Sequence, residues 1–191
     1  MSQINLASHP EILHFPKDGK PVLTPNEWQV WSDSQDEGAH FESPDLDHGA
    51  HKVLVPFAWW IAHHHEVDIQ SKAKAGQIGV WFATDDDILR HVDVIEAGKE
   101  VWPLVAAHFP IFRDGRSFST AALLRDRFQW QGEIRAIGDV LIDQLLQGAR
   151  VGFDSFALRP DQQLDVALKQ FDLFTFTTQN SWRDKRATLS A

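Results

Sequence analysis

The chain has 191 residues, a net charge of −9, and 43% hydrophobic and 24% charged residues. These values are typical of one globular domain, and the acidic balance argues against nucleic acid or an anionic membrane as a partner. The absence of cysteine excludes disulfides, thiolate-bound zinc and cysteine-ligated iron–sulfur clusters within this chain. No apolar run approaches the roughly 20 residues of a membrane span, and the first residues lack a signal-peptide core. We therefore expect a cytoplasmic protein.

Residues 1–51 predict an N-terminal extended arm followed by an acidic loop. Five prolines punctuate this segment, and residues 33–47 carry six acidic residues and no lysine or arginine. Proline-rich, acidic stretches favour extended or solvated chain over packed helices. The composition changes after this point, which predicts an α/β domain over residues 52–180. The polar residues 181–191 predict a mobile tail.

From His51 onward, apolar runs alternate with amphipathic segments. Five short apolar runs predict strands, at 53–56, 77–83, 104–109, 133–138 and 153–158. Helical spacing of apolar residues predicts helices between and after these strands, at 57–72, 86–97, 118–128, 140–149 and 161–174. Five consecutive βα units predict a parallel sheet with right-handed crossovers. We expect an α/β fold with an irregular N-terminal arm, the sheet being either open and doubly wound or a partial TIM-like barrel.

The loop after the third predicted strand is a candidate anion site, because ligands of such folds gather at the carboxyl ends of the strands. It places the turn Asp114-Gly115, the guanidinium of Arg116 and the hydroxyls of Ser117 and Ser119 just before a helix. Free backbone N–H groups, the helix dipole and a guanidinium together favour an anion. The alternative is a simple turn in which Ser119 caps the helix and Arg116 is solvated, since the spacing is not that of a diagnostic phosphate loop.

Polar residues in and after the other strands are further candidates. Asp139 and Asp143 are four residues apart, so they share a helix face and suit acid–base work or a hard cation, unless the first is a cap and the second is solvated. Arg135 and Asp154 lie in neighbouring predicted strands and are expected to pair as buried charges, with Arg135 a second candidate for holding an anion. His108 lies within an apolar strand and, with Asp139 and Asp143, is a candidate catalytic residue.

The sequence contains no motif that identifies a bound metal or cofactor. Consecutive helical residues point about 100° apart, so the three histidines at 63–65 predict a solvated helix surface rather than a metal site. The dinucleotide glycine fingerprint, the P-loop, the HExxH motif and the Gly-x-Ser-x-Gly elbow are absent.

Three segments resemble a known bacterial family: residues 114–128, 132–145 and 152–156. Shorter stretches at 53–61 and 79–87 share the resemblance. The family is domain-of-unknown-function family nine-three-four, whose members are described as probable oxidoreductases involved in sulfite reduction. The resemblance offers these motif positions: Asp114, Gly115, Arg116, Ser119, Arg125, Arg135, Gly138, Asp139, Asp143 and Gln144. Many members carry cysteine directly before the Gly-Phe-Asp segment, whereas this chain has Val151, so a mechanism through that thiol does not operate here.

The resemblance implies a place in sulfate assimilation and leaves three hypotheses open. The first is a redox enzyme, which is disfavoured because an iron–sulfur cluster needs cysteines that this chain lacks. The second is a non-catalytic accessory protein that binds a small oxyanion, or docks on sulfite reductase or another sulfate-assimilation enzyme. The third is a barrel-like lyase or isomerase, in which Asp139 or Asp143 is the base and Arg116 and Arg135 hold an anionic substrate.

Overall fold

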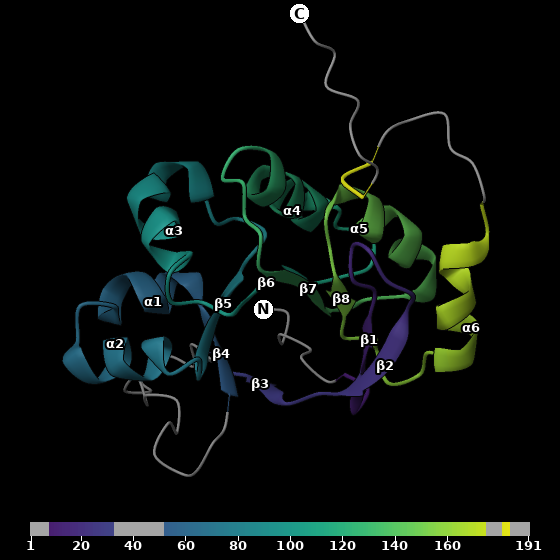
Figure 1. Cartoon of the computed structure of the whole chain (residues 1–191), viewed down its shortest axis with the longest axis horizontal. Coiled ribbons are helices and arrows are strands. Elements are labelled where there is room, and N and C mark those ends of the chain that lie inside the picture. The colour runs from purple at the N-terminus through teal and green to yellow at the C-terminus, as the bar shows by residue number, and fades with distance from the viewer. Residues whose placement is uncertain (1–7, 33–51, 175–180, 184–191) are drawn as a thin grey trace, which may run out of the picture.

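The computed structural model describes residues 8–32, 52–174 and 181–183. Within these residues the chain forms one eight-stranded sheet in the order β2-β1-β8-β7-β6-β5-β4-β3 (Figure 1). The strands are β1 (Glu11–His14), β2 (Val22–Pro25), β3 (Trp28–Val30), β4 (Lys52–Pro56), β5 (Ile78–Phe82), β6 (Leu104–Phe109), β7 (Glu133–Gly138) and β8 (Ser155–Phe156). The α-helices are α1 (Phe57–His63), α2 (Val67–Lys74), α3 (Val92–Gly98), α4 (Arg116–Asp126), α5 (Leu145–Val151) and α6 (Leu164–Leu168). Short 3-10 helices lie at Ile88–His91, Ile142–Gln144 and Lys169–Asp172.

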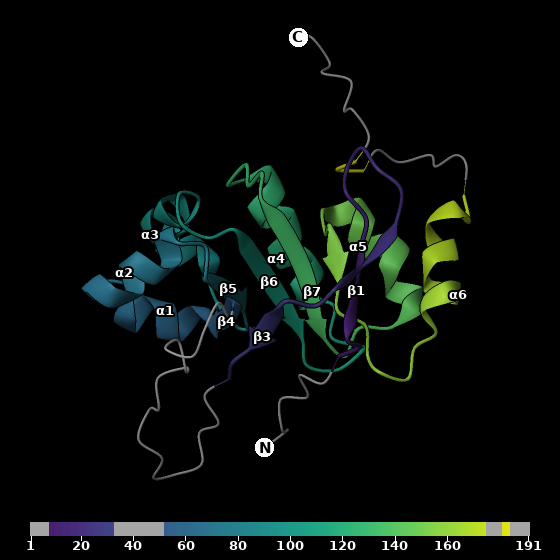
Figure 2. The ribbon, with the colours of Figure 1, turned by 60° about the horizontal axis from the view of Figure 1, so that its bottom comes forward.

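The sheet is mixed and curled into a half-barrel. Strands β3 to β8 are parallel and adjacent in chain order, whereas β1 pairs antiparallel with both β2 and β8. The edge strands β2 and β3 are separated in the chain by Asn26 and Glu27 alone. Because three peptide steps span at most about 10 Å, this connection keeps the two edges close together (Figure 2). The expectation of a purely parallel sheet is therefore wrong, because the N-terminal hairpin adds antiparallel pairs.

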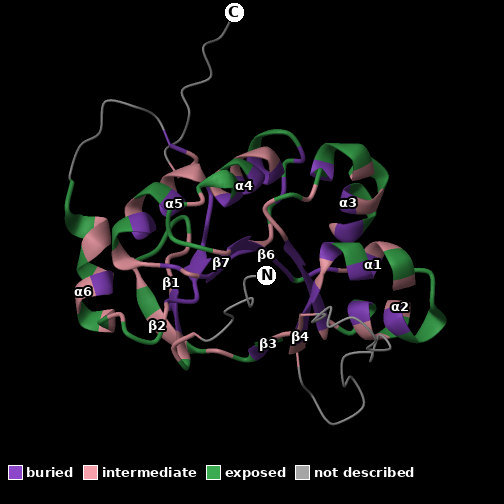
Figure 3. Ribbon diagram, turned by 180° about the vertical axis from the view of Figure 1, so that it is seen from behind, coloured by how far each residue is buried: buried purple, intermediate pink, exposed green. Residues whose placement is uncertain are grey.

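The described helices cover only the outer face of the sheet, as the burial-coloured ribbon in Figure 3 also shows. Alternate strand residues such as Val80, Ala107 and Ala136 point outward and pack with helix side chains in the main core. The intervening residues, such as Leu54 and Ala106, point inward and form a second cluster without helix members. This single-sided covering and the unbroken strand order exclude the doubly wound alternative, which needs helices on both faces.

Polar residues also line the inner face. Arg135 on β7 and Ser155 on β8 are register partners and both point inward. The Arg135 guanidinium donates to Asn26 Oδ1 across the half-barrel at 3.3 Å, and the same oxygen accepts the Trp28 backbone N–H. The interior retains a cavity of about 10 Å³, lined in part by Trp28, Arg135 and Ile137. This is room for about one water molecule, so the interior is packed rather than a ligand chamber.

The five strands expected from apolar runs each have a counterpart, and the helices differ more. The helix expected at 57–72 is two helices, α1 and α2, and the one at 118–128 starts two residues earlier, at Arg116. The helices expected at 86–97, 140–149 and 161–174 each contain a 3-10 helix beside a short α-helix. The N-terminal arm contains three strands rather than irregular chain, while the acidic loop at 33–47 lies outside the described residues.

Candidate functional site at the carboxyl ends of the strands

The loop between β6 and α4 projects from the carboxyl end of the central strands (Figure 1). Ile111 and Phe112 in this loop are each 46% exposed, and Arg113 is exposed with no partner among the described residues. Asp139 Oδ2 accepts the Phe112 backbone N–H at 2.8 Å, and the Gln144 amide donates to the Phe112 carbonyl at 2.9 Å. The loop is thus fixed at both the N–H and the carbonyl of Phe112, while the Ile111, Phe112 and Arg113 side chains are exposed.

Asp139 is a structural link in this arrangement rather than a helix cap. Gly138 leaves β7 with φ +94°, a conformation that favours glycine, and a Cβ there would lie 2.4 Å from the Phe109 carbonyl oxygen. This turn directs the Asp139 carboxylate toward the β6–α4 loop. The other carboxylate oxygen, Oδ1, accepts a 2.8 Å ion-pair hydrogen bond from Arg159, which follows β8 in the chain. Asp143, the other member of the expected pair, is exposed. No contact joins it to Asp139 among the interactions of the described residues.

Arg116 and Asp114 form an ion pair at the start of α4. The Arg116 Nε and Nη2 atoms donate to the two Asp114 oxygens, at 3.0 and 2.6 Å, and the Asp114 carboxylate also accepts the Arg116 backbone N–H. The hydrogen bonds from Arg116 hold the pKa of Asp114 below its usual value, against the opposing effect of burial. Ser117 is buried, and its hydroxyl donates to the His108 carbonyl at 2.5 Å. Ser119 lies inside α4 and not at its cap.

A surface pocket of about 240 Å³ lies between the 3-10 helix Ile88–His91 and α4. Its wall includes the polar groups Thr84, Asp86, Arg116 and Ser119 and the apolar Ile88 and Leu123. The predicted anion-site residues Arg116 and Ser119 therefore meet at one pocket. The structure does not bring Arg135 to it, because Arg135 lies in the barrel interior.

His108 points inward from β6 and is only 4% exposed. Its ring packs edge-on against Trp81, with centroids 5.4 Å apart, and its Nε2 has no hydrogen-bond partner among the described residues. Burial lowers the pKa of His108, with Asp114 opposing this shift weakly. The imidazole is therefore neutral at pH 7. Gly138 leaves space for it, since a Cβ there would lie 2.9 Å from Nε2.

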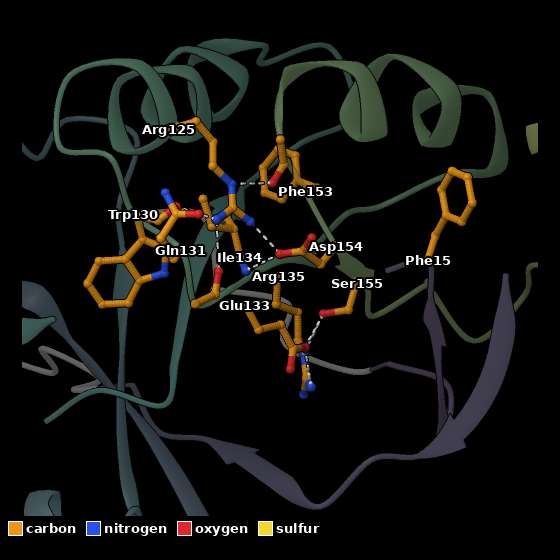
Figure 4. A network of polar contacts seen from close by, with 12 residues as sticks. Phe15, Arg125, Trp130, Gln131, Glu133, Ile134, Arg135, Phe153, Asp154 and Ser155 are labelled. Atoms are coloured by element: carbon orange, nitrogen blue, oxygen red, sulfur yellow. Dashed lines mark hydrogen bonds and ion pairs between the residues drawn. The ribbon is translucent and has the colours of Figure 1, made fainter. Parts of the chain in front are cut away.

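The expected pair Arg135–Asp154 does not form, as Figure 4 shows. Arg135 points into the interior and pairs with Glu133 at 2.8 Å, while Glu133 also accepts the Ser155 hydroxyl. Asp154 points to the helix side, where it pairs with Arg125 of α4. The prediction is wrong because the two side chains lie on opposite faces of the sheet.

Arg125 anchors α4 to the sheet from a fully buried position. Its Nε donates to the Gly152 carbonyl at 3.0 Å, and its Nη1 donates to the carbonyls of Trp130 and Gly132 at 2.6 and 2.9 Å. With Asp154 at Nη2, each of the three guanidinium nitrogens has at least one acceptor. A buried guanidinium is tolerated when its donors are satisfied in this way, so this motif position is structural.

Sequence reasoning missed a contact made by the C-terminal segment. Residues 181–183, expected to begin a mobile tail, pack against the body of the protein. Arg183 donates to the carbonyls of Ala149, Phe15 and Phe153 at 3.1, 2.6 and 2.7 Å. Burial lowers its pKa to about 10. The Trp182 ring contacts the Arg125 guanidinium, 4.0 Å from its centroid.

The three consecutive histidines diverge at the end of α1. His63 stacks on Trp59 at 4.4 Å, and its Nδ1 lies 2.8 Å from the Trp59 carbonyl, whereas the His64 Nδ1 faces the Ile61 carbonyl. Across the ranges that the structure describes, no group of three histidine or acidic side chains is placed to hold a metal ion. In the same ranges, no helix is long and apolar enough to cross a bilayer.

Together, the fold and the residues at the carboxyl ends define a half-barrel α/β protein that presents a fixed, exposed loop beside a small pocket. A family model described as bacterial protein of unknown function DUF934 matches residues 79–189. This is more than half of the chain, and the chain belongs to that family. No curated protein and no solved structure shows significant similarity to it.

Proposed function

We propose that this protein is a non-catalytic accessory component of sulfite reduction that docks on sulfite reductase through residues 111–113. The link to sulfite reduction rests on the family resemblance. The docking role rests on one observation: the family motif positions Gly138, Asp139 and Gln144 all serve to hold the β6–α4 loop in a solvent-facing conformation. The same proposal places the protein in the cytoplasm with the sulfate-assimilation enzymes.

The chemistry of the loop supports a protein partner. The loop exposes a phenylalanine, a branched aliphatic side chain and an arginine that has no partner in the described part of the chain. Aromatic and arginine side chains carry much of the binding energy at interfaces. Burying the exposed parts of Ile111 and Phe112 is worth about 1 kcal/mol or more for each side chain. Because the Phe112 backbone is already fixed at both its N–H and its carbonyl, little backbone entropy is lost on binding.

The other hypotheses have less support from the geometry. Arg116 and Arg135, which would together hold an oxyanion, line separate cavities and do not converge on one site. Asp139, one proposed base of a lyase or isomerase, is engaged by Arg159 and a backbone N–H. An iron–sulfur cluster for electron transfer would have to reside in the partner, since this chain supplies no thiolate.

The test is direct binding to purified sulfite reductase, measured by interferometry for the parent and two single variants. Phe112→Ser removes the central apolar contact and is expected to weaken binding by about tenfold or more. Phe174→Ser is the matched control, because Phe174 is also an exposed phenylalanine, at 63%, and lies outside the β6–α4 loop, near the C-terminal end of the domain. No binding by the parent contradicts the accessory role, and an equal loss in both variants contradicts docking through this loop.

A further inference from the structure

The pocket beside α4 has a property that the docking proposal does not use: it contains separate acidic and basic groups facing a shared space. Its volume of about 240 Å³ is many times the roughly 10–15 Å³ that a cavity needs to hold one water molecule. A bare inorganic oxyanion would leave most of that space to solvent. A ligand with several carbon atoms is a better match in size.

The acidic group is Asp86, which comes directly after β5. Its Oδ2 accepts the Ala83 backbone N–H at 2.7 Å, but no cation is paired with the carboxylate among the described residues. Burial raises the pKa of Asp86, against the opposing effects of the Ala83 N–H hydrogen bond and of the nearby His91. Its neighbour Asp87 differs, because it already pairs with Arg90 at 2.9 Å. Asp86 is therefore the carboxylate that remains available to a ligand cation.

The basic group is Arg116. Asp114 occupies the Nε and one Nη2 donor, which leaves Nη1 without a partner in the described part of the chain. A guanidinium has five N–H donors, so the fork between Nη1 and Nη2 still presents donors to a second carboxylate. The Asp114 pair fixes the orientation of this fork. Ser119 adds a hydroxyl on the same wall.

We propose that this pocket binds a free amino acid, with the ligand ammonium at Asp86, the ligand carboxylate at Arg116 and the ligand side chain against Ile88 and Leu123. A zwitterion satisfies both charged groups at once. A simple anion makes no contact with Asp86 and a simple amine makes none with Arg116, so each lacks one charge-assisted hydrogen bond that the amino acid makes. This inference does not depend on docking through residues 111–113.

The test starts with calorimetric titration of the full chain with each proteinogenic amino acid. At least one is expected to bind with a dissociation constant below about 1 mM. Analogues of that amino acid that lack either the amino group or the carboxylate are expected to bind at least about tenfold more weakly, since each loses one charge-assisted contact. The L-norvaline set of norvaline, pentanoate and butylamine gives the same comparison on an aliphatic ligand.

Two isosteric variants distinguish binding at Asp86 from a general effect of removing one negative charge. Asp86→Asn keeps an oxygen for the Ala83 N–H and is expected to reduce binding about tenfold. Asp93→Asn is the control, because Asp93 lines a separate pocket of about 210 Å³. The proposal is overturned if no amino acid binds at up to about 10 mM, if the analogue without an amino group binds as tightly, or if both variants lose the same affinity.

Discussion

The contact of Arg183 with the body of the protein yields a quantitative prediction. Its guanidinium donates three hydrogen bonds to backbone carbonyls, which belong to β1–β2 loop residue Phe15, to Ala149 in α5 and to Phe153 before β8. Hydrogen bonds from a charged donor contribute about 1.5 kcal/mol each at the low end, and ordering an arginine side chain costs about 2 kcal/mol. Arg183→Ala is therefore expected to lower the free energy of unfolding by about 2–3 kcal/mol.

The assay is urea unfolding at pH 7, followed by tryptophan fluorescence. For a chain of this size, the loss corresponds to a fall of roughly 5–10 °C in Tm. Arg127→Ala is the matched control, because Arg127 is exposed directly after α4 and is expected to change stability by less than about 0.5 kcal/mol. If Arg183→Ala and Arg127→Ala unfold at the same urea concentration, residues 181–183 do not stabilise the fold as the contacts imply.

Three further predictions concern the sheet. Gly138→Ala is expected to destabilise the protein by about 1–3 kcal/mol in urea unfolding, because the positive φ and the close Phe109 carbonyl oppose a Cβ; an unchanged midpoint would refute this. Burial favours a raised pKa for Glu133, but Arg135 and a serine hydroxyl outweigh it and hold the pKa below the ordinary 4.5. Glu133 therefore stabilises the fold above pH 4.5 and loses this effect as the pH falls below it, so the stability gap between parent and Glu133→Gln is expected to shrink from pH 7 to pH 4. An NMR titration is expected to place the pKa of His108 below 6.5, because burial disfavours the imidazolium; a value above 6.5 contradicts the buried, neutral ring.

The sequence predicted the strands best, because buried parallel strands are nearly continuous apolar runs. The segment Leu104–Phe109, buried along its whole length, is the clearest example. The three N-terminal strands are only three or four residues long. Of these, β2 and β3 lie at the edges of the sheet and are only partly buried, so they lack that signal. Breaks within helical segments, such as the one between α1 and α2, depend on tertiary packing that periodicity alone does not report.

The sequence indicated that certain charged residues are buried and paired, but it did not indicate which residues they pair with. Arg135 and Asp154 are both buried and paired, but they lie on opposite faces of the sheet. Alternation within each strand does not fix the register between two strands, which pairs Arg135 with Ser155. The role of Asp139 could not be predicted, because its partners Phe112 and Arg159 lie 27 and 20 residues away in the chain. Such long-range pairs leave no local pattern.

Docking through residues 111–113 is tested most directly by hydrogen exchange of the protein alone and with purified sulfite reductase. The proposal predicts that amide exchange in the β6–α4 loop slows in the complex, while exchange around Phe174 stays the same. Unchanged exchange in that loop, in a mixture where the two proteins bind each other, would contradict the proposed docking surface.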